Sequence, residues 1–113
     1  MFGLSKDTLA KIRQSIHKLA QIDKVIIYGS RAKGNYRNGS DIDITLFGEN
    51  LNLNNSIYPL MDLLDDLYLP YMFDISIFDK IDNQNLKDHI NRVGQVFYQR
   101  DLQKDNITDI VEE

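Results

Sequence analysis

The chain has 113 residues, of which 42% are hydrophobic and 10% aromatic, enough apolar material for one compact core and too little for two. It has no cysteine, which excludes disulfides and thiolate metal sites, so a bound metal would be held by oxygen atoms or by the two histidines. A formal net charge of -4 argues against non-specific binding to duplex nucleic acid, because that affinity grows with the number of phosphates that Lys and Arg neutralise.

Neither a membrane span nor a secretion signal is indicated. No segment approaches the roughly 18 to 20 consecutive apolar residues that a membrane span needs, and the stretch "MFGLSKDTLAK" lacks the apolar core of a secretion signal. We therefore expect a cytoplasmic protein.

The first half of the chain predicts one helix followed by two strands. Apolar residues recur at helical spacing over residues 5–20, with Ser5 as the N-cap and with Leu4 and Leu9 placed for a hydrophobic staple. Residues 24–28 form a short β-branched run that ends at Gly29, and residues 41–47 alternate between polar and apolar side chains. Both segments are typical of strands.

The second half predicts a helix, a third strand and a weaker helix. A helical stripe covers residues 57–68, with Pro59 tolerated in its first turn and Pro70 stopping it. Residues 72–78 alternate as a strand does, and the last helix ends near Gly94. Residues 48–56 form a polar turn or loop, and residues 104–113 form an acidic tail after a single domain over residues 1–103. This order predicts an α/β (α+β) fold with a small mixed sheet of three to four strands packed with helices.

Asp41 and Asp43 are separated by one residue in the second predicted strand. Side chains at positions i and i+2 share a face, so the two carboxylates would lie about 6 to 7 Å apart and repel by roughly 2 to 3 kcal/mol before salt screening. A divalent cation between them would reverse the sign of that energy. Asp74 shares a face with Ser76 in the third strand, so it can join the pair if the two strands are neighbours. Such a group of carboxylates suits Mg²⁺, which also binds substrate phosphates.

The turn before these aspartates has the character of an anion site. Gly29 ends the first strand, and Ser30 opens a short helical turn whose N–H groups and hydroxyl would point outward. Arg31, Lys33 and Arg37 add positive charge, and of these we favour phosphate contact only for Arg31. A polyphosphate would fit this turn and metal held by the aspartates.

The stretch "GSRAKGNYRNGSDID" is a Gly-Ser pair, ten residues and Asp-x-Asp. Together with Asp74 it resembles the nucleotidyltransferase superfamily that includes DNA polymerase β. The short chain and the "IIYGS" segment are similar to the minimal nucleotidyltransferases (MNT), which are antitoxins encoded beside HEPN-domain toxins.

This resemblance implies a polymerase beta-like fold and a set of roles. Gly29 and Ser30 would hold the triphosphate of ATP, Asp41 and Asp43 would bind two Mg²⁺ ions, and Asp74 would bind the catalytic ion and help deprotonate the attacking hydroxyl. The reaction would transfer AMP to a hydroxyl of a partner HEPN-domain toxin, in a hetero-oligomer whose partner is encoded by an adjacent gene.

Two other functions stay open. The chain could be a non-catalytic nucleotide-binding module that neutralises its partner by complex formation. Transfer to a small molecule is a weaker alternative, because the chain has no room for an acceptor domain. Asp79 and Asp82 are explained as turn residues, and Asp62, Asp65 and Asp66 by a solvated helix face. His17 and His89 lie alone at helical positions, with no second histidine at ligand spacing, and are not expected to be catalytic.

Overall fold

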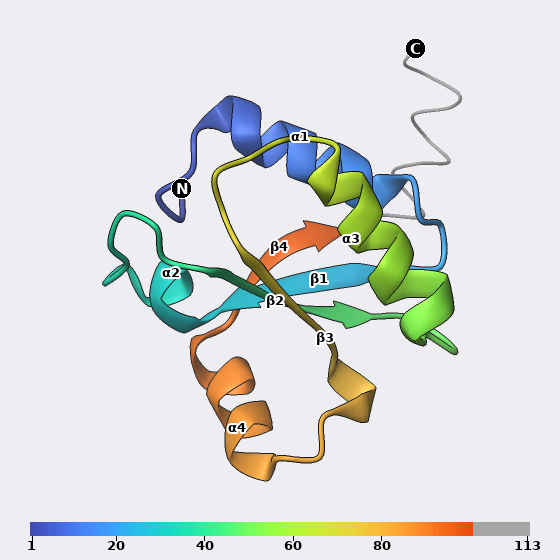
Figure 1. The fold of residues 1–113 in the computed structure, drawn as a ribbon. Helices are drawn as coiled ribbons and strands as arrows, with labels where there is room; N and C mark the ends of the chain where they lie inside the picture. Colours follow the sequence, from blue (N-terminus) through green and yellow to red (C-terminus); the bar gives the residue numbers. More distant parts are fainter. Residues whose placement is uncertain (101–113) are drawn as a thin grey trace, which may run out of the picture.

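The computed structural model describes residues 1–100 of the protein; the predicted acidic tail at 104–113 lies outside these residues. The core of the fold is a four-stranded mixed sheet in the order β3-β2-β1-β4 (Figure 1). Strand β1 (Lys24–Tyr28) pairs antiparallel with both β2 (Ile42–Phe47) and β4 (Gln95–Gln99), and β2 pairs in parallel with β3 (Phe73–Ile77). The predicted α+β fold with a small mixed sheet is confirmed.

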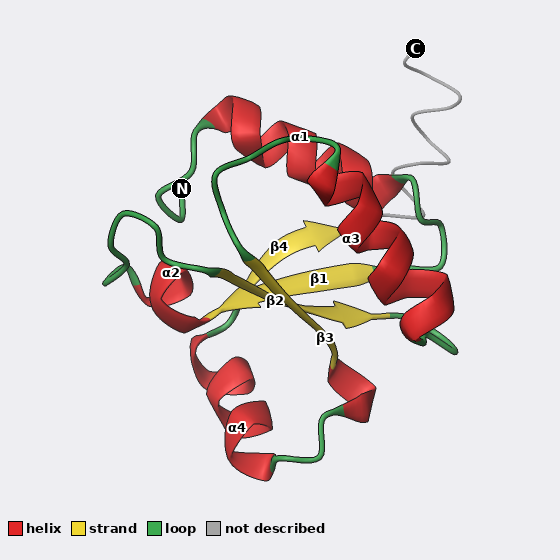
Figure 2. Ribbon diagram, viewed as in Figure 1, coloured by secondary structure: helices red, strands yellow, loops and turns green. Residues whose placement is uncertain are grey.

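Helices cover both faces of this sheet. Figure 2 shows α1 (Lys6–His17) and α3 (Tyr58–Asp65) on one side and α4 (Gln84–Val93) on the other. The short helix α2 (Gly29–Lys33) directly follows β1. No helix in residues 1–100 combines the length and the hydropathy that crossing a membrane requires.

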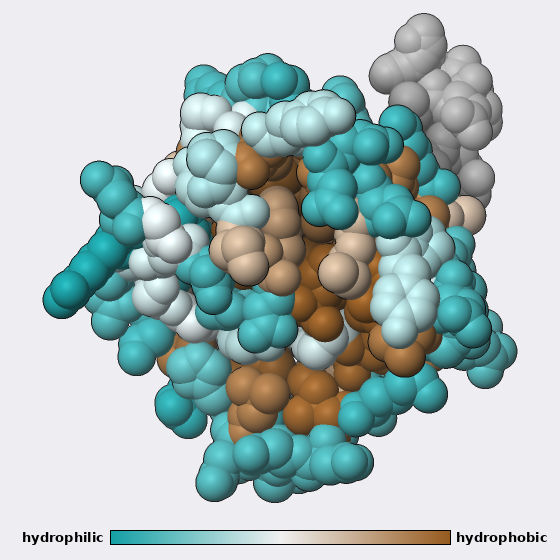
Figure 3. Space-filling view, viewed as in Figure 1, coloured by the Kyte–Doolittle hydropathy of each residue, from teal (hydrophilic) through white to brown (hydrophobic). Residues whose placement is uncertain are grey.

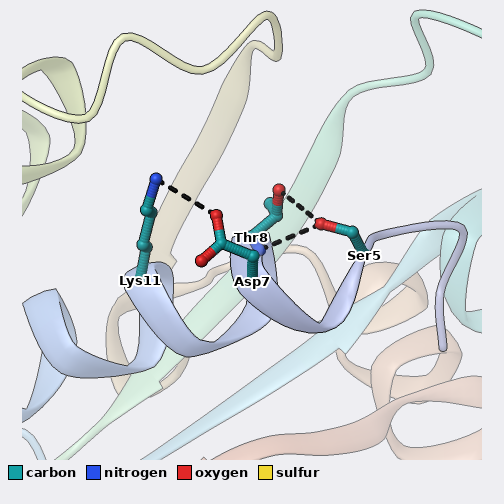
Figure 4. Close-up of polar contacts among 4 residues, drawn as sticks. All are labelled: Ser5, Asp7, Thr8 and Lys11. Atoms are coloured by element: carbon teal, nitrogen blue, oxygen red, sulfur yellow. Dashed lines mark hydrogen bonds and ion pairs between the residues drawn. The ribbon is translucent and has the colours of Figure 1, made fainter.

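Helix α1 begins where the sequence predicts. The Ser5 hydroxyl accepts a hydrogen bond from the backbone N–H of Thr8 at 3.1 Å, which satisfies one of the free donors of the first turn (Figure 4). Asp7 in the same first turn forms an exposed ion pair of 3.1 Å with Lys11 of the next turn. The helix ends at His17, earlier than the predicted residue 20.

The hydrophobic core lies between the sheet and the pair α1 and α3. Its fully buried side chains share an alternating position on the strands or an inward position on the helices, and they include Ile12, Ile16, Val25, Ile27, Ile42, Ile44, Leu46 and Leu60. Period-two alternation in the strands and 3.6-residue periodicity in the helices therefore meet in one apolar layer.

Two segments differ from the sequence-based prediction. The region predicted as a polar loop at 48–56 ends in a π-helical turn, η1 (Leu53–Ile57), in which Asn52 and Asn55 cap each other's backbone. Helix α3 then begins at Tyr58 and ends at Asp65, with Pro59 in its first turn as predicted. The chain leaves the helix earlier than predicted, and Tyr68 adopts a positive φ of 53°.

The end of the described chain forms a strand that the sequence pattern did not predict. Strand β4 follows α4 with Gly94 as the cap, and it buries Phe97. The sequence-based prediction allowed three to four strands but located only three. A short 3-10 turn, η2 (Phe78–Lys80), connects β3 toward α4.

Candidate active site

The register of two parallel strands brings the predicted carboxylates together. Asp43 of β2 lies directly opposite Asp74 of β3, one position after the pair Ile42 and Phe73. The condition set on the sequence, that the second and third strands be neighbours, is therefore met. Asp41 lies immediately before β2, which begins at Ile42, and is exposed.

The charges of these carboxylates affect one another. Burial raises the pKa of Asp43, and the carboxylates of Asp74 and Asp41 raise it further. The pKa of Tyr28 is also raised, mainly by burial, with contributions from Asp74 and Asp43. A negative potential is thus concentrated where β1, β2 and β3 lie side by side.

Gly29 shapes the boundary between the turn and the carboxylates. Its φ is +73°, a conformation that favours glycine, and a Cβ atom at this position would overlap the Asp43 carboxylate. The Gly-Ser turn and Asp43 are consequently in direct proximity, as the polyphosphate hypothesis requires. Ser30 is half-buried in the first turn of α2, which confirms the predicted helical turn.

Arg31 occupies a structural position within this turn. Its guanidinium donates to the carbonyl oxygen of Ser40 through Nε and Nη2, at 3.1 and 2.9 Å, and to the carbonyl oxygen of Phe2 through Nη1 at 2.9 Å. The residue is only 3% exposed. These bonds tie the N-terminal segment and the loop before Asp41 to α2. Contact between Arg31 and phosphate stays a prediction. Lys33 and Arg37 are exposed.

The three aspartates have the right ligand atoms for a hard divalent cation, but their side chains are not gathered around one point. Asp41, Asp43 and Asp74 supply only carboxylate oxygens, the ligands that Mg²⁺ prefers. Within residues 1–100, however, no group of three or more His, Cys, Asp or Glu side chains is gathered closely enough to form a finished metal site. The side chains would have to reorient to share an ion, and metal binding by these three residues stays a prediction.

Tyr28 was not singled out from the sequence, yet it borders the site. It is the cross-strand partner of Asp43, is 7% exposed, and meets the ring of His89 edge-on at 6.2 Å. Its position in the sequence could have revealed it, because Tyr28 is the last strand residue before Gly29. His89 thus packs from α4 against the site, and no catalytic role is assigned to it.

The family of the chain follows from its sequence. Residues 10–103 match the family described as Polymerase beta, Nucleotidyltransferase. The chain belongs to this family. The match contains the Gly-Ser turn, Asp41, Asp43 and Asp74, and confirms the resemblance on which the expected fold rests. Among curated proteins, no sequence relative was found.

Solved structures with the same fold include several toxin–antitoxin complexes. A chain in a toxin–antitoxin structure with AMP-PNP aligns with a TM-score of 0.66 and 17% identity, covering 90% of this chain and 81% of the other. A chain in the MntA–HepT complex gives 0.62 and 15%, covering 94% and 81%. A chain in the structure of tri-AMPylated Shewanella oneidensis HEPN toxin with MNT antitoxin gives 0.55 and 17%, covering 97% and 82%. At these identities the likeness shows a shared fold.

Proposed function

We propose that this nucleotidyltransferase uses Mg²⁺ and transfers AMP from ATP to a hydroxyl group of a partner HEPN-domain toxin, and that it acts as the antitoxin of the pair. The observation that carries the proposal is the meeting of Asp43 and Asp74 on adjacent strands, with Gly29 against the Asp43 carboxylate. Membership of the nucleotidyltransferase family supports the reaction class.

The choice of nucleotide and acceptor is supported by the structural neighbours. One of them is a toxin–antitoxin structure with AMP-PNP, and another holds a tri-AMPylated HEPN toxin with an MNT antitoxin. The proposal extends both properties to this chain, with a partner encoded by an adjacent gene.

Each residue of the site has a defined task in this proposal. Gly29 and Ser30 bind the triphosphate through the N–H groups of the turn and the Ser30 hydroxyl. Asp41 and Asp43 would hold two Mg²⁺ ions and Asp74 would share one of them; bound ions supply charge neutralisation for the attacking and leaving oxygens. An Asp74 carboxylate oxygen takes the proton of the acceptor hydroxyl. The hydroxyl oxygen then bonds to the α-phosphorus while the bond from that phosphorus to the bridging oxygen breaks, and pyrophosphate leaves.

The test is transfer of label from α-³²P ATP to the HEPN-domain protein encoded beside this chain, with Mg²⁺ present. Asp43→Asn and Asp74→Asn should each lower the initial rate by about 10³-fold or more, because each removes a charge that the transition state requires. Asp79→Asn, an exposed aspartate of η2, is the matched control and should label at the wild-type rate. Equal labelling by all three variants would overturn the catalytic assignment.

One observation favours the alternative of a non-catalytic binding module. Within residues 1–100, the three aspartates do not form a finished metal site. A growth assay separates the two functions: Asp41→Asn combined with Asp43→Asn should fail to rescue cells from the toxin if chemistry neutralises it. Full rescue by this variant would instead assign neutralisation to contact.

A further inference from the structure

An apolar groove runs along the edge strand β3, beside α3 at one hollow and beside η1 at the other. It consists of two adjoining hollows of about 170 Å³ each, which share Ile75. The first is lined chiefly by Met61, Leu64, Tyr71, Met72 and Phe73, and the second by Leu53, Ile57, Ile77 and Ile81. Figure 3 shows hydrophobic surface in the middle of the face that β3 crosses in Figure 1. We call this surface the α3–β3 groove.

Several large apolar side chains along the groove are exposed to solvent. Met61 is 45% exposed, Leu53 54% and Met72 72%. Large apolar side chains scattered singly are normal, but a contiguous patch of them marks an interaction site. Strand β3 is also the terminal strand of the sheet within the described residues, so one of its edges has no paired strand there.

The charges that border the groove select its occupant. Asp65 lines the first hollow, and both Asp62 on the same helix and Asp66 at its C-cap are exposed. One cation, Lys80, lines the far end of the second hollow. A second copy of this chain would bring acidic residues of α3 against acidic residues of α3 in a two-fold contact, and the chain as a whole carries a net charge of -4. An apolar surface flanked by Lys or Arg is complementary instead.

The groove shares strand β3 with the candidate active site. Asp74 lies on β3 between Phe73 and Ile75, both of which line the groove with side chains on the opposite face from the carboxylate. Ser76, on the same face as Asp74, lines the second hollow. A protein held along β3 would therefore lie against the edge strand that carries the residue proposed to deprotonate the acceptor.

We propose that the α3–β3 groove is the docking surface for the acceptor protein, and that it receives an apolar segment flanked by basic side chains. This inference rests on the proposed function, because it takes the HEPN-domain partner as the protein that docks. It adds the place of docking, the chemistry of the docking segment, and a separation between the surface that binds the partner and the carboxylates that act on it.

The experiment measures the affinity of the purified chain for the HEPN-domain protein encoded beside it, together with the affinity for an ATP analogue. Met61→Glu and Met72→Glu should each weaken partner binding by about tenfold or more, because a charge would be buried against apolar surface. Analogue affinity should not change. Val96→Glu is the matched control, since Val96 is 50% exposed on β4 at the opposite edge of the sheet. It should bind both ligands as the wild type does.

A charge reversal tests the second half of the inference. Asp65→Lys should weaken partner binding by roughly three- to tenfold at low salt, with less difference from the wild type at high salt. This substitution is on an exposed helix position and should leave the thermal melting curve unchanged. Equal salt dependence in Asp65→Lys and the wild type would overturn the basic character of the occupant.

The outcomes distinguish failure of this inference from failure of the proposed function. Wild-type partner affinity in both methionine variants, with transfer of AMP intact, would overturn the groove as the docking surface and leave the proposed function standing. Absence of any complex between the wild-type chain and the HEPN-domain protein would overturn both. A wild-type dimer that Met61→Glu converts to a monomer without loss of partner binding would assign the groove to self-association and overturn the inference.

Discussion

The two faces of the β-sheet are built from the same strands but differ in character: one is buried and apolar, and the other carries carboxylates. On β2, Ile42, Ile44 and Leu46 have no exposed surface and pack under α1 and α3. Asp43 alternates with them and faces the other side, opposite Asp74. Hydrophobic burial stabilises the first face by about 1.5–3 kcal/mol for each large side chain, whereas the second face concentrates like charges that oppose folding.

The contrast shows how one strand can carry both core residues and closely spaced carboxylates. Period-two alternation allows one strand to serve the core with every second residue and the site with the residues between. The repulsion among the carboxylates is tolerated because the same strand is fixed by its buried isoleucines. Substitutions on the two faces should therefore differ in sign as well as in size.

The largest expected effect on stability comes from the apolar face. Ile44→Ala should lower the free energy of unfolding by about 3–4 kcal/mol, because Ile44 is fully buried and the neighbouring residues can close only part of the resulting cavity. Urea denaturation followed by circular dichroism measures the change. Val96→Ala, at a half-exposed position, should change the free energy by less than about 0.5 kcal/mol. Equal losses in the two variants would contradict the assignment of the core.

Gly29 follows β1 directly and lies against the Asp43 carboxylate. Its substitution should have the next largest effect on stability. Gly29→Ala should cost about 2 kcal/mol, since the backbone of alanine is strained at φ +73° and the Asp43 side chain must move away from the new methyl group. Gly39→Ala is a matched control: its φ is +82°, and among the described residues nothing beyond its chain neighbours lies within 4 Å of the position that the methyl group would take. The control should lose only about 1 kcal/mol and keep its affinity for an ATP analogue. Melting curves and analogue titrations on both variants test this difference.

Sequence reasoning anticipated the pairing of Asp43 with Asp74 better than it located the end of the sheet. Alternation in two strands was enough to place Asp43 and Asp74 on one face, and strand pairing then made them neighbours. Strand β4 was missed because "QVFYQ" has only one fully buried residue, Phe97, and follows a helix after a single glycine. Its three central residues, Val96, Phe97 and Tyr98, form an unbroken apolar and aromatic run, so no period-two alternation marks the strand as it does in β3.

The role of Arg31 shows a different limit. Its position in a basic turn beside Gly29 and Ser30 suggested phosphate contact. Its hydrogen-bond partners are carbonyl groups 29 and 9 residues away in the chain, Phe2 and Ser40. Tertiary folding brings these carbonyls to the guanidinium, and no pattern within the turn itself predicts them.

A substitution at Arg31 separates a structural role from phosphate contact. Arg31→Lys should lower the free energy of unfolding by about 1–2 kcal/mol, because an ammonium group cannot reproduce the forked bonds to Ser40 and Phe2. Exposed Arg37→Lys is the control and should leave stability within about 0.5 kcal/mol. Unchanged stability of Arg31→Lys together with a marked loss of ATP affinity would show that the side chain serves phosphate rather than the fold.

The smallest expected effect is a gain in stability on the polar face. Burial and the neighbouring carboxylates raise the pKa of Asp43 in the folded protein. A carboxyl group with a raised pKa binds its proton more tightly when folded, so its ionisation costs stability at pH values above its folded pKa, and that cost disappears as the pH falls through this value. Asp43→Asn removes the cost and should raise the free energy of unfolding at pH 7 by up to about 1 kcal/mol.

The same variant should show this gain only under defined conditions. With EDTA present, the difference in melting temperature between Asp43→Asn and the wild type should shrink steadily as the pH is lowered through the raised pKa of Asp43, because the carboxyl group then becomes protonated in the wild type. Asp79→Asn, on an exposed turn, should show no comparable gain. Added Mg²⁺ with an ATP analogue should stabilise the wild type more than Asp43→Asn, because a ligand stabilises the folded state that binds it. A gain in stability that does not change with pH would contradict charge repulsion as its cause. The gain would then come from side-chain packing at position 43.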